Sequence, residues 1–142
     1  MEKTDLLKIE NQLCFPLYAA ARKVVGAYAP VLKPLDLTYT QYITMMVLWE
    51  QNNETVGTLC RKLHLDSGTM TPLLKKLESR GYLARVRDTA DERIVHVTLT
   101  EKGMELKNEA SYVPGRIAGC MNLSDDEART LYAILYKIIN TI

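Results

Sequence analysis

The stretch of residues 66–81 restricts the possible folds more than any other part of the chain. Its apolar side chains recur at the spacing of a single helix face, which has to be covered by a core. Asp66 or Ser67 can cap the start of this helix, and Gly81 suits the left-handed residue that commonly ends one. The apolar residues of this face are Met70, Leu73, Leu74 and Leu77.

The outer face of the same helix carries short side chains at its start and basic side chains behind them. Short side chains allow the start of a helix to approach base edges, and lysines reach phosphates. We therefore expect this face to bind DNA, although the pattern by itself also fits an ordinary solvated helix. The residues of the expected face are Ser67, Gly68, Thr69, Thr71, Pro72, Lys75 and Lys76.

A second amphipathic helix stands directly before this one and favours the DNA-binding interpretation. Thr55 can cap it, and the apolar residues within 56–63 again follow helical spacing. Further upstream, Thr38 or Thr40 can cap an almost wholly apolar helix over 41–50. Two short helices joined by a tight turn are typical of the helix-turn-helix motif.

After these helices the apolar period changes to the two-residue period of strands. Segments 82–87 and 94–99 alternate in this way around the polar segment 88–93, which predicts a two-stranded wing. We expect Arg93 at its tip to enter a minor groove, where arginine is favoured electrostatically, and Asp91 to orient the guanidinium. A solvated turn with ordinary surface charges is the alternative. The arginines of the wing are Arg85, Arg87 and Arg93.

The two ends of the chain carry more apolar surface than one small domain can cover. Residues 6–29 have the pattern of a helix with two adjacent apolar stripes, and Ser124 opens a last amphipathic helix with a capping box. We expect both ends to form a dimer interface, because a helix covered from two sides in so short a chain needs a partner subunit. Pro16 inside the first helix predicts a kink close to Cys14.

These patterns together predict one domain over residues 1–142 that is mainly α-helical with a small two-stranded β wing. The winged helix-turn-helix covers about 38–100, and dimerisation helices cover about 5–30 and 101–142. Pro30 is expected to end the first of them.

Charge and hydropathy narrow the class of protein. The net charge is +1, but residues 55–100 carry eight basic and five acidic side chains, whereas each flank has one more acid than base. This modest bias suits a phosphate-binding face. The longest apolar run is far below the ~20 residues that span a bilayer, and the start of the chain lacks an apolar signal region. We expect a cytoplasmic protein with no membrane association.

No catalytic or metal-binding grouping stands out in the sequence. His64 and His96 are isolated and lack the ligand clusters of a zinc site. A Cys-x-x-Cys pair, a phosphate loop and a Ser/His/Asp grouping are all missing, so we expect no enzyme activity, no cofactor and no metal. Three cysteines, an odd number, do not suggest a disulfide framework.

Several local motifs carry a resemblance that covers essentially the whole chain. They are Glu-Asn-Gln-Leu-Cys-Phe at 10–15, Leu-Thr-Tyr-Thr-Gln-Tyr at 37–42, the segment 65–78, and Asp-Glu-Arg at 91–93. With this order of elements the chain resembles the MarR family of bacterial winged-helix regulators. Cys14 with the later Asp-Ser-Gly-Thr is similar to the OhrR branch of organic-hydroperoxide-sensing repressors, whereas Asp-Glu-Arg is shared widely in the family.

The resemblance implies a homodimeric repressor that releases a pseudo-palindromic operator after an organic hydroperoxide oxidises the thiolate of Cys14. The tyrosines that contact the sensing sulfur in this branch match Tyr28 and Tyr39, with Tyr18 close by. Fourteen residues separate Cys14 from Tyr28, about 21 Å on a straight helix, so contact requires the partner chain. Phenol hydroxyls that donate to a sulfur anion favour the thiolate, which is the form that a peroxide attacks.

The resemblance also gives Cys120 a possible role. In OhrR-like proteins the oxidised cysteine either waits as a sulfenic acid for a small thiol or is resolved by a second cysteine of the other subunit. We expect Cys14 and Cys120 of opposite chains to lie beyond bonding distance in the reduced protein. A role for Cys120 as a buried filler beside Ile117 is the equal alternative. Cys60 lies on an apolar stripe and is expected in the core.

Other functions remain open. A regulator of the same build could respond to a small phenolic or lipophilic ligand in the dimer cleft, with Cys14 incidental. A broader redox or virulence regulator would differ only in its target genes. A thiol peroxidase is disfavoured, because Cys14 has no Cys-x-x-Cys partner.

Overall fold

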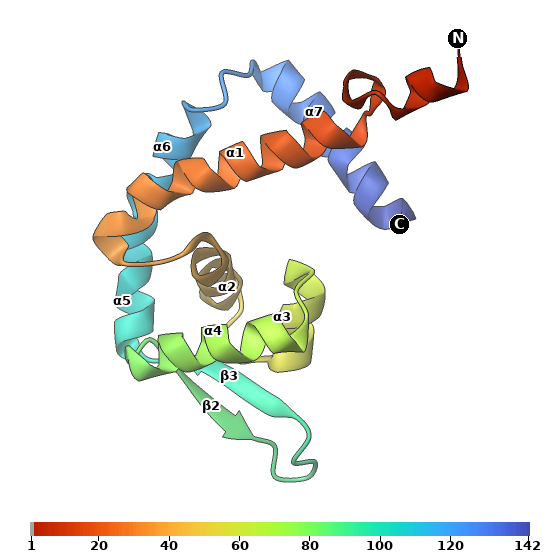
Figure 1. The fold of residues 1–142 in the computed structure, drawn as a ribbon. Helices are drawn as coiled ribbons and strands as arrows, with labels where there is room; N and C mark the ends of the chain where they lie inside the picture. The colour runs from red at the N-terminus through yellow and green to blue at the C-terminus, as the bar shows by residue number, and fades with distance from the viewer. Residues whose placement is uncertain (1) are drawn as a thin grey trace.

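The computed structural model describes residues 2–142, which form a winged helix-turn-helix lobe between helical ends (Figure 1). Figure 1 shows α1 running above α2, α3 and α4, with the β2–β3 hairpin projecting below them. The helices are α1 (Cys14–Leu32), α2 (Tyr39–Glu50), α3 (Val56–Leu63), α4 (Ser67–Ser79), α5 (Glu101–Glu109), α6 (Val113–Ala118) and α7 (Asp125–Thr141). The strands are β1 (Glu54–Thr55), β2 (Leu83–Arg87) and β3 (Val95–Leu99).

The winged helix-turn-helix lobe is built as the sequence predicts. Thr38 caps α2, Thr55 caps α3 and Asp66 caps α4, each by accepting a backbone N–H of the first turn. Gly81 follows α4 with φ +81°, the left-handed conformation that glycine adopts without strain. The predicted apolar face of α4 is buried in the main core, so this helix is fixed from inside while its other face stays free.

The sheet has one strand more than the predicted hairpin. β2 and β3 pair antiparallel with Arg85 opposite Val97, which confirms the two-stranded wing. The short β1 adds to the other side of β3, with Glu54 opposite Val97, and gives the order β1-β3-β2. The sequence pattern missed β1 because two residues are too few to show a period. Its Glu54 is a buried charged residue whose carboxylate pairs with Lys62 at 2.8 Å.

α5 packs closely against the base of the wing. Gly103 lies so near the backbone that a Cβ atom would collide with the carbonyl oxygen of Tyr82. The indole Nε1 of Trp49 on α2 donates to the carbonyl of Gly103 at 2.8 Å, which ties α2 to α5. These contacts anchor the hairpin, because an isolated two-stranded ribbon is only marginally stable in water.

The first helix differs from its prediction at both ends. Two 3₁₀ turns, Lys3–Leu7 and Ile9–Asn11, precede α1, which begins only at Cys14. Pro16 therefore lies in the first turn, where backbone nitrogens have no hydrogen-bond acceptor within the helix. Because a proline there removes no helical hydrogen bond, the predicted kink at Pro16 was wrong. The break predicted at Pro30 was also wrong, because α1 continues through Pro30 to Leu32.

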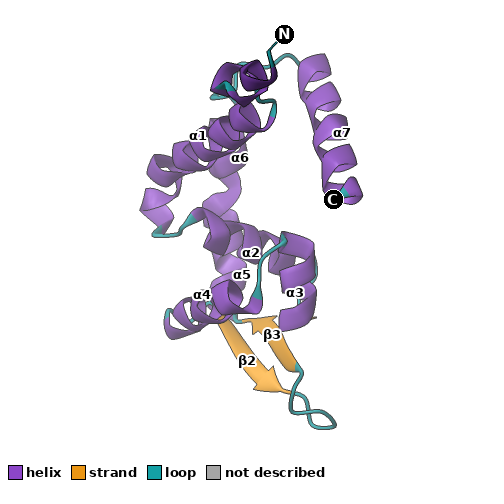
Figure 2. Ribbon diagram, turned by 45° about the vertical axis from the view of Figure 1, so that its right-hand side comes forward, coloured by secondary structure: helices purple, strands orange, loops and turns teal. Residues whose placement is uncertain are grey.

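The C-terminal region is divided at a different place from the one predicted. Pro114 and Gly115 in the sequence predict a helix break after about residue 112, but Pro114 lies in the first turn of α6, which a proline tolerates, and the helical path ends after Ala118. Ser124 forms the predicted capping box with Glu127 and opens α7. No residue of α7 is buried, and Figure 2 shows this helix standing apart from the winged-helix lobe. None of the helices within residues 2–142 combines the length and apolar character that crossing a bilayer requires.

Candidate functional site

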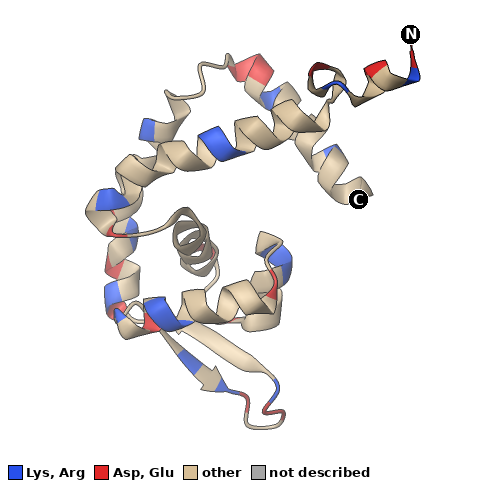
Figure 3. Cartoon of the chain, in the orientation of Figure 1, with Lys and Arg blue, Asp and Glu red and all other residues tan. Residues whose placement is uncertain are grey.

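The outer face of α4 presents the short and basic side chains that the sequence singles out. Thr69 donates its backbone N–H to the Asp66 carboxylate at 2.7 Å, which fixes the start of the helix. Of the predicted face only Thr71 is partly buried, and the rest is exposed. Figure 3 places basic residues on α4 and along the wing, on one side of the lobe. The exposed members are Ser67, Gly68, Thr69, Pro72, Lys75 and Lys76.

Arg85 is held inside the protein rather than offered to a ligand. Its Nη2 lies 3.1 Å from the Glu78 carboxylate, and its backbone N–H donates to the same carboxylate at 2.9 Å. The Arg85 hydrogen bonds lower the pKa of Glu78 below its ordinary value. The Nε of Arg85 is buried and makes no hydrogen bond within residues 2–142. This geometry makes Arg85 the link between α4 and β2, and its DNA contact stays a prediction.

The tip of the wing holds an arginine in a fixed but exposed position. Asp91 accepts from Nε of Arg93 at 3.0 Å and from Nη2 at 3.1 Å, so the predicted orienting contact is present. The Arg93 side chain is nevertheless 91% exposed. Hydrogen bonding to Arg93 lowers the pKa of Asp91, so the carboxylate stays charged. Arg87 is also exposed and donates to the carbonyl of Glu92 at 2.9 Å.

A second acid organises the wing turn and was missed at the sequence level. Asp88 accepts the backbone N–H groups of Ala90 and Asp91 at 2.8 and 3.0 Å, and its other oxygen lies 2.8 Å from Nε2 of His96. The contact with His96 is the main reason that the pKa of Asp88 is lowered. The signal was an aspartate at the start of a turn, where its carboxylate can bond the backbone two residues later.

The two tyrosines expected near the sensing sulfur form a cluster in α1 and α2. The rings of Tyr28 and Tyr39 are 4.7 Å apart, and Tyr42 lies 5.9 Å from Tyr28. Burial, and then the neighbouring phenol of Tyr39, raises the pKa of Tyr28 above its ordinary value of 10.0. Its hydroxyl therefore stays protonated near neutral pH and can donate a hydrogen bond.

Cys14 lies at the opposite end of the same helix from these tyrosines. It is the first residue of α1 and is exposed, whereas Tyr28 stands one turn from the last. Tyr28 lies fourteen positions after Cys14, about 21 Å along the helix, and the Tyr39 ring packs against Tyr28 at a tilt, so neither phenol reaches the Cys14 sulfur within one chain. Tyr18 lies closer but is exposed, and its hydroxyl accepts from Arg22 at 3.2 Å.

The other two cysteines occupy different environments. Cys120 is exposed just after α6, and its sulfur lies 3.3 Å from the carbonyl of Arg116. It is not buried within one chain, so a role as a buried filler would require a partner chain to cover it. Cys60 is partly buried and packs against the core, as predicted.

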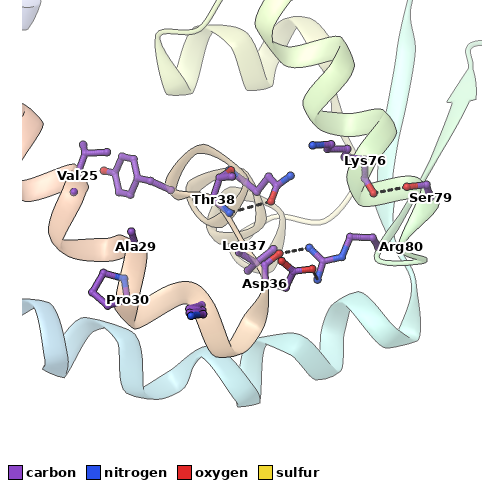
Figure 4. A pocket seen from close by; sticks show the side chains of 13 residues that line it. Val25, Ala29, Pro30, Asp36, Leu37, Thr38, Lys76, Ser79 and Arg80 are labelled. Atoms are coloured by element: carbon purple, nitrogen blue, oxygen red, sulfur yellow. Dashed lines mark hydrogen bonds and ion pairs between the residues drawn. The ribbon is translucent and has the colours of Figure 1, made fainter.

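An open cavity of about 890 Å³ lies between α1 and the end of α4. Figure 4 shows Val25, Ala29 and Pro30 on the α1 side and Lys76 and Ser79 on the α4 side. Sequence reasoning missed this space, because its walls come from segments about fifty residues apart. In the described chain no three His, Cys, Asp or Glu side chains gather in a way that could hold a metal ion.

Known proteins whose sequences are similar to this chain are transcriptional regulators. The family model described as transcriptional regulator SarA/Rot matches residues 27–110. The organic hydroperoxide resistance transcriptional regulator of Bacillus subtilis (strain 168) is 43% identical over 140 residues, which cover 99% of this chain and 95% of that protein.

Solved structures of AbfR from Staphylococcus epidermidis are similar over almost the whole chain. Reduced AbfR bound to DNA is 31% identical, with 99% of this chain and 96% of that chain covered and a TM-score of 0.83. Disulfide-formed AbfR is 32% identical, with 98% and 94% covered, and has a TM-score of 0.65. The fold of this chain is therefore more similar to reduced, DNA-bound AbfR than to disulfide-formed AbfR. The chain belongs to the MarR- and SarA-type family of winged-helix transcriptional regulators, in the branch that includes the organic hydroperoxide resistance regulators.

Proposed function

We propose that this chain is a homodimeric, DNA-binding transcriptional repressor of the cytoplasm that senses organic hydroperoxides through Cys14 and then releases its operator. The observation that carries the DNA-binding half is the exposed outer face of α4 beside a wing whose Arg93 is fixed by Asp91 yet fully accessible. The helix suits a major groove, and the arginine suits the adjacent minor groove. Lys75, Lys76 and Arg87 supply phosphate contacts in this proposal.

The dimer follows from the apolar side chains that both ends expose. In the N-terminal segment Leu13 is 83% exposed, and on α7 Tyr132 is 65% exposed. Monomeric proteins rarely leave such large patches uncovered, and the dimers of this family's DNA-binding motif match a two-fold symmetric operator. We infer that a second copy covers the N-terminal segment, the start of α1 and α7, as dimerisation regions of about 5–30 and 101–142.

The sensing site is completed by this second copy. Cys14 cannot reach Tyr28 or Tyr39 of its own chain, but α1 of a partner running in the opposite direction would bring those phenols to the sulfur. Neutral phenols that donate to the sulfur stabilise the thiolate, and the thiolate attacks the hydroperoxide to give a sulfenic acid and an alcohol. Tyr18, exposed beside Cys14, is assigned to the same cluster. Because the relatives that this chain matches are transcriptional regulators, we propose that it regulates rather than catalyses.

The sensing proposal is tested with an operator selected from random DNA by the reduced protein. Wild type should release this DNA in a gel shift after treatment with cumene hydroperoxide. Cys14→Ser, which keeps nearly the same side-chain size, should remain bound under the same treatment. Release of Cys14→Ser by the hydroperoxide would contradict the proposal.

The role of Cys120 is a separate part of the proposal. Its exposure beside the dimer-forming region suits a thiol that attacks the sulfenic acid of the partner's Cys14, forms an intersubunit disulfide and expels water. The disulfide form known for AbfR supports such a step in this family. A covalent dimer on a non-reducing gel, lost in Cys14→Ser and in Cys120→Ser, is expected. A persistent monomer band carrying one small thiol on Cys14 would rule it out.

The cavity of about 890 Å³ favours a second candidate, control by a small lipophilic or phenolic ligand. Its walls combine apolar side chains with the cations Lys33, Lys76 and Arg80, which suit a weak organic acid. Salicylate added to the same operator complex separates the two. Release by salicylate but not by hydroperoxide would favour ligand control over oxidation.

A further inference from the structure

Arg80, the residue directly after α4, makes contacts that belong neither to the DNA-binding face nor to the cysteine site. Its Nη2 donates to the carbonyl of Leu35 at 3.1 Å, and its Nη1 donates to the carbonyl of Asp36. These two carbonyls lie in the connection between α1 and α2, where Asp36 adopts a left-handed conformation with φ 52°. The end of α4, the recognition helix of the proposed DNA-binding face, is thus bonded to the backbone that follows α1 (Figure 4).

Tyr82 and Lys102 hold the guanidinium of Arg80 in place. The Tyr82 ring is almost fully buried, with the Arg80 guanidinium and the Lys102 ammonium each 4.9 Å from its centroid. Lys102 also donates to the carbonyl of Arg80 at 2.8 Å, and the Tyr82 hydroxyl lies 3.3 Å from Nη2. Because these contacts fix the side chain before any DNA is bound, its two hydrogen bonds act as a stiff link.

The link matters because α1 and α4 do not pack against each other along this side. The cavity of about 890 Å³ separates Val25 and Ala29 on α1 from Lys76 and Ser79 on α4. Side chains that would otherwise set the angle between the two helices are missing there. Arg80 closes one end of this space, so its contacts help to decide how α4 is oriented relative to α1.

The position of α1 is in turn tied to the cysteine at its start. α1 has 19 residues and is a rod of about 28 Å, with Cys14 as its first residue and Leu32 as its last. A movement of the rod that begins at Cys14 displaces the far end, and Leu35 and Asp36 follow that end directly. Their carbonyls would pull on Arg80 and through it on α4.

We propose that Arg80 is the positioning residue that couples the recognition helix to α1. It holds α4 in the DNA-binding orientation in the reduced dimer and passes the displacement of α1 to α4 when Cys14 is oxidised. The second half rests on the proposed sensing function, whereas the first half does not.

In this proposal the two hydrogen bonds from Arg80 to backbone carbonyls, rather than its positive charge, couple α4 to α1. The Asp36 carboxylate is 3.6 Å from Arg80 and 93% exposed, so this ion pair is weak. Asp36→Asn, which tolerates the left-handed conformation, should therefore leave the coupling intact. Arg80→Lys keeps the charge but loses the planar fork that reaches two carbonyls, so it should behave like Arg80→Met.

The first experiment measures the distance between the two wings of the DNA-free dimer. A spin-labelled non-natural amino acid at the exposed Thr89 leaves the native cysteines in place, and electron–electron resonance gives the wing-to-wing distance distribution. Arg80→Met and Arg80→Lys should broaden the distribution, whereas Asp36→Asn and the exposed control Lys107→Gln should not. An unchanged distribution in Arg80→Met, or full recovery by Arg80→Lys, would overturn the inference.

The second experiment compares operator affinity in the reduced and hydroperoxide-treated states at equal amounts of folded dimer. Arg80→Met should bind the operator about tenfold more weakly when reduced, and oxidation should then change its affinity less than in wild type. A residue that only stabilises the fold would lower the melting temperature and leave both affinities unchanged. If hydroperoxide fails to release wild type, the sensing function fails, but the wing distances still test Arg80.

Discussion

The winged-helix lobe and the terminal helices differ in how far a single chain can complete them. In the lobe, α2, α3, α4 and the sheet enclose a core in which Leu48, Leu59 and Leu74 are fully buried, and the end of α1, α5 and α6 extend this core. The N-terminal turns and α7 together contain no buried residue. The lobe is therefore complete within one chain. The ends form one half of an interface, and a second copy has to supply the other half.

This difference separates two kinds of functional residue. The side chains of α4 and the wing that we propose bind DNA are already oriented within one chain, as the Asp91–Arg93 pair shows. The proposed redox residues are not, because Cys14 and the Tyr28–Tyr39 pair lie at opposite ends of α1. When a sensor divided between two chains is oxidised, it can change the orientation of the two DNA-binding lobes relative to each other.

Substituting the core of the lobe should have the largest effect. Leu74→Ala should lower the free energy of unfolding by about 2–5 kcal/mol, because a fully buried leucine leaves a cavity. Urea denaturation followed by circular dichroism measures the change, with the exposed Lys75→Ala as the matched control. A loss as small as that of Lys75→Ala would mean that the lobe is not the stable part.

Substituting the exposed face of α7 should separate the chains without unfolding the lobe. Leu131, 42% exposed in the single chain, would be covered on both sides of a symmetric interface, so Leu131→Asp should weaken dimerisation by about 10²- to 10⁴-fold. Analytical ultracentrifugation should find folded monomers that bind the operator poorly. The exposed Arg129→Ala on the same helix serves as control. A stable Leu131→Asp dimer would place the interface elsewhere.

The wing tip should contribute to DNA binding but not to folding. Arg93→Ala should weaken operator binding by about tenfold, mainly at A·T-rich flanks, and reduce the slope of affinity against salt by about one. Fluorescence anisotropy titrations at several salt concentrations measure both quantities. Unchanged affinity across several operators would remove the minor-groove role.

The smallest expected effect concerns the link between α4 and β2. Arg85 lowers the pKa of Glu78 below 4.5 in the folded state, so this carboxylate stabilises the fold above that pH. The contribution disappears as the pH falls through the lowered value. Because Glu78 is partly exposed, Glu78→Gln should cost less than about 1 kcal/mol at pH 7. The stability difference between Glu78→Gln and wild type should shrink as the pH falls from 4.5 through the lowered pKa of Glu78. A difference that stays constant with pH would exclude the ion pair.

Sequence patterns predicted the lobe better than the ends for a physical reason. Caps such as Thr55 and Asp66, the apolar stripe of α4 and the period change after Gly81 are local, so neighbouring residues determine them. The effects of Pro16 and Pro30 depend on where α1 begins and ends, which their own residue type does not specify.

Contacts between distant segments escaped prediction altogether. The bonds from Arg80 to Leu35 and Asp36 join segments more than forty residues apart, and no periodicity reports them. The same holds for the cavity beside Arg80 and for the pairing of β1 with β3. For Cys14, the resemblance to the OhrR branch predicted oxidation by a hydroperoxide. The length of helix between Cys14 and Tyr28 predicted that a partner chain is needed.

The most direct test of the divided sensor is a mixed dimer. One chain carries Cys14→Ser with its tyrosines intact, and the other carries Tyr28→Phe and Tyr39→Phe with its cysteine intact. If Cys14 uses the partner's phenols, this dimer holds one complete site, and mass spectrometry should find its single Cys14 oxidised by hydroperoxide at the wild-type rate per site. Oxidation at the slow rate of the homodimer that carries both Tyr→Phe changes would contradict a site shared between chains.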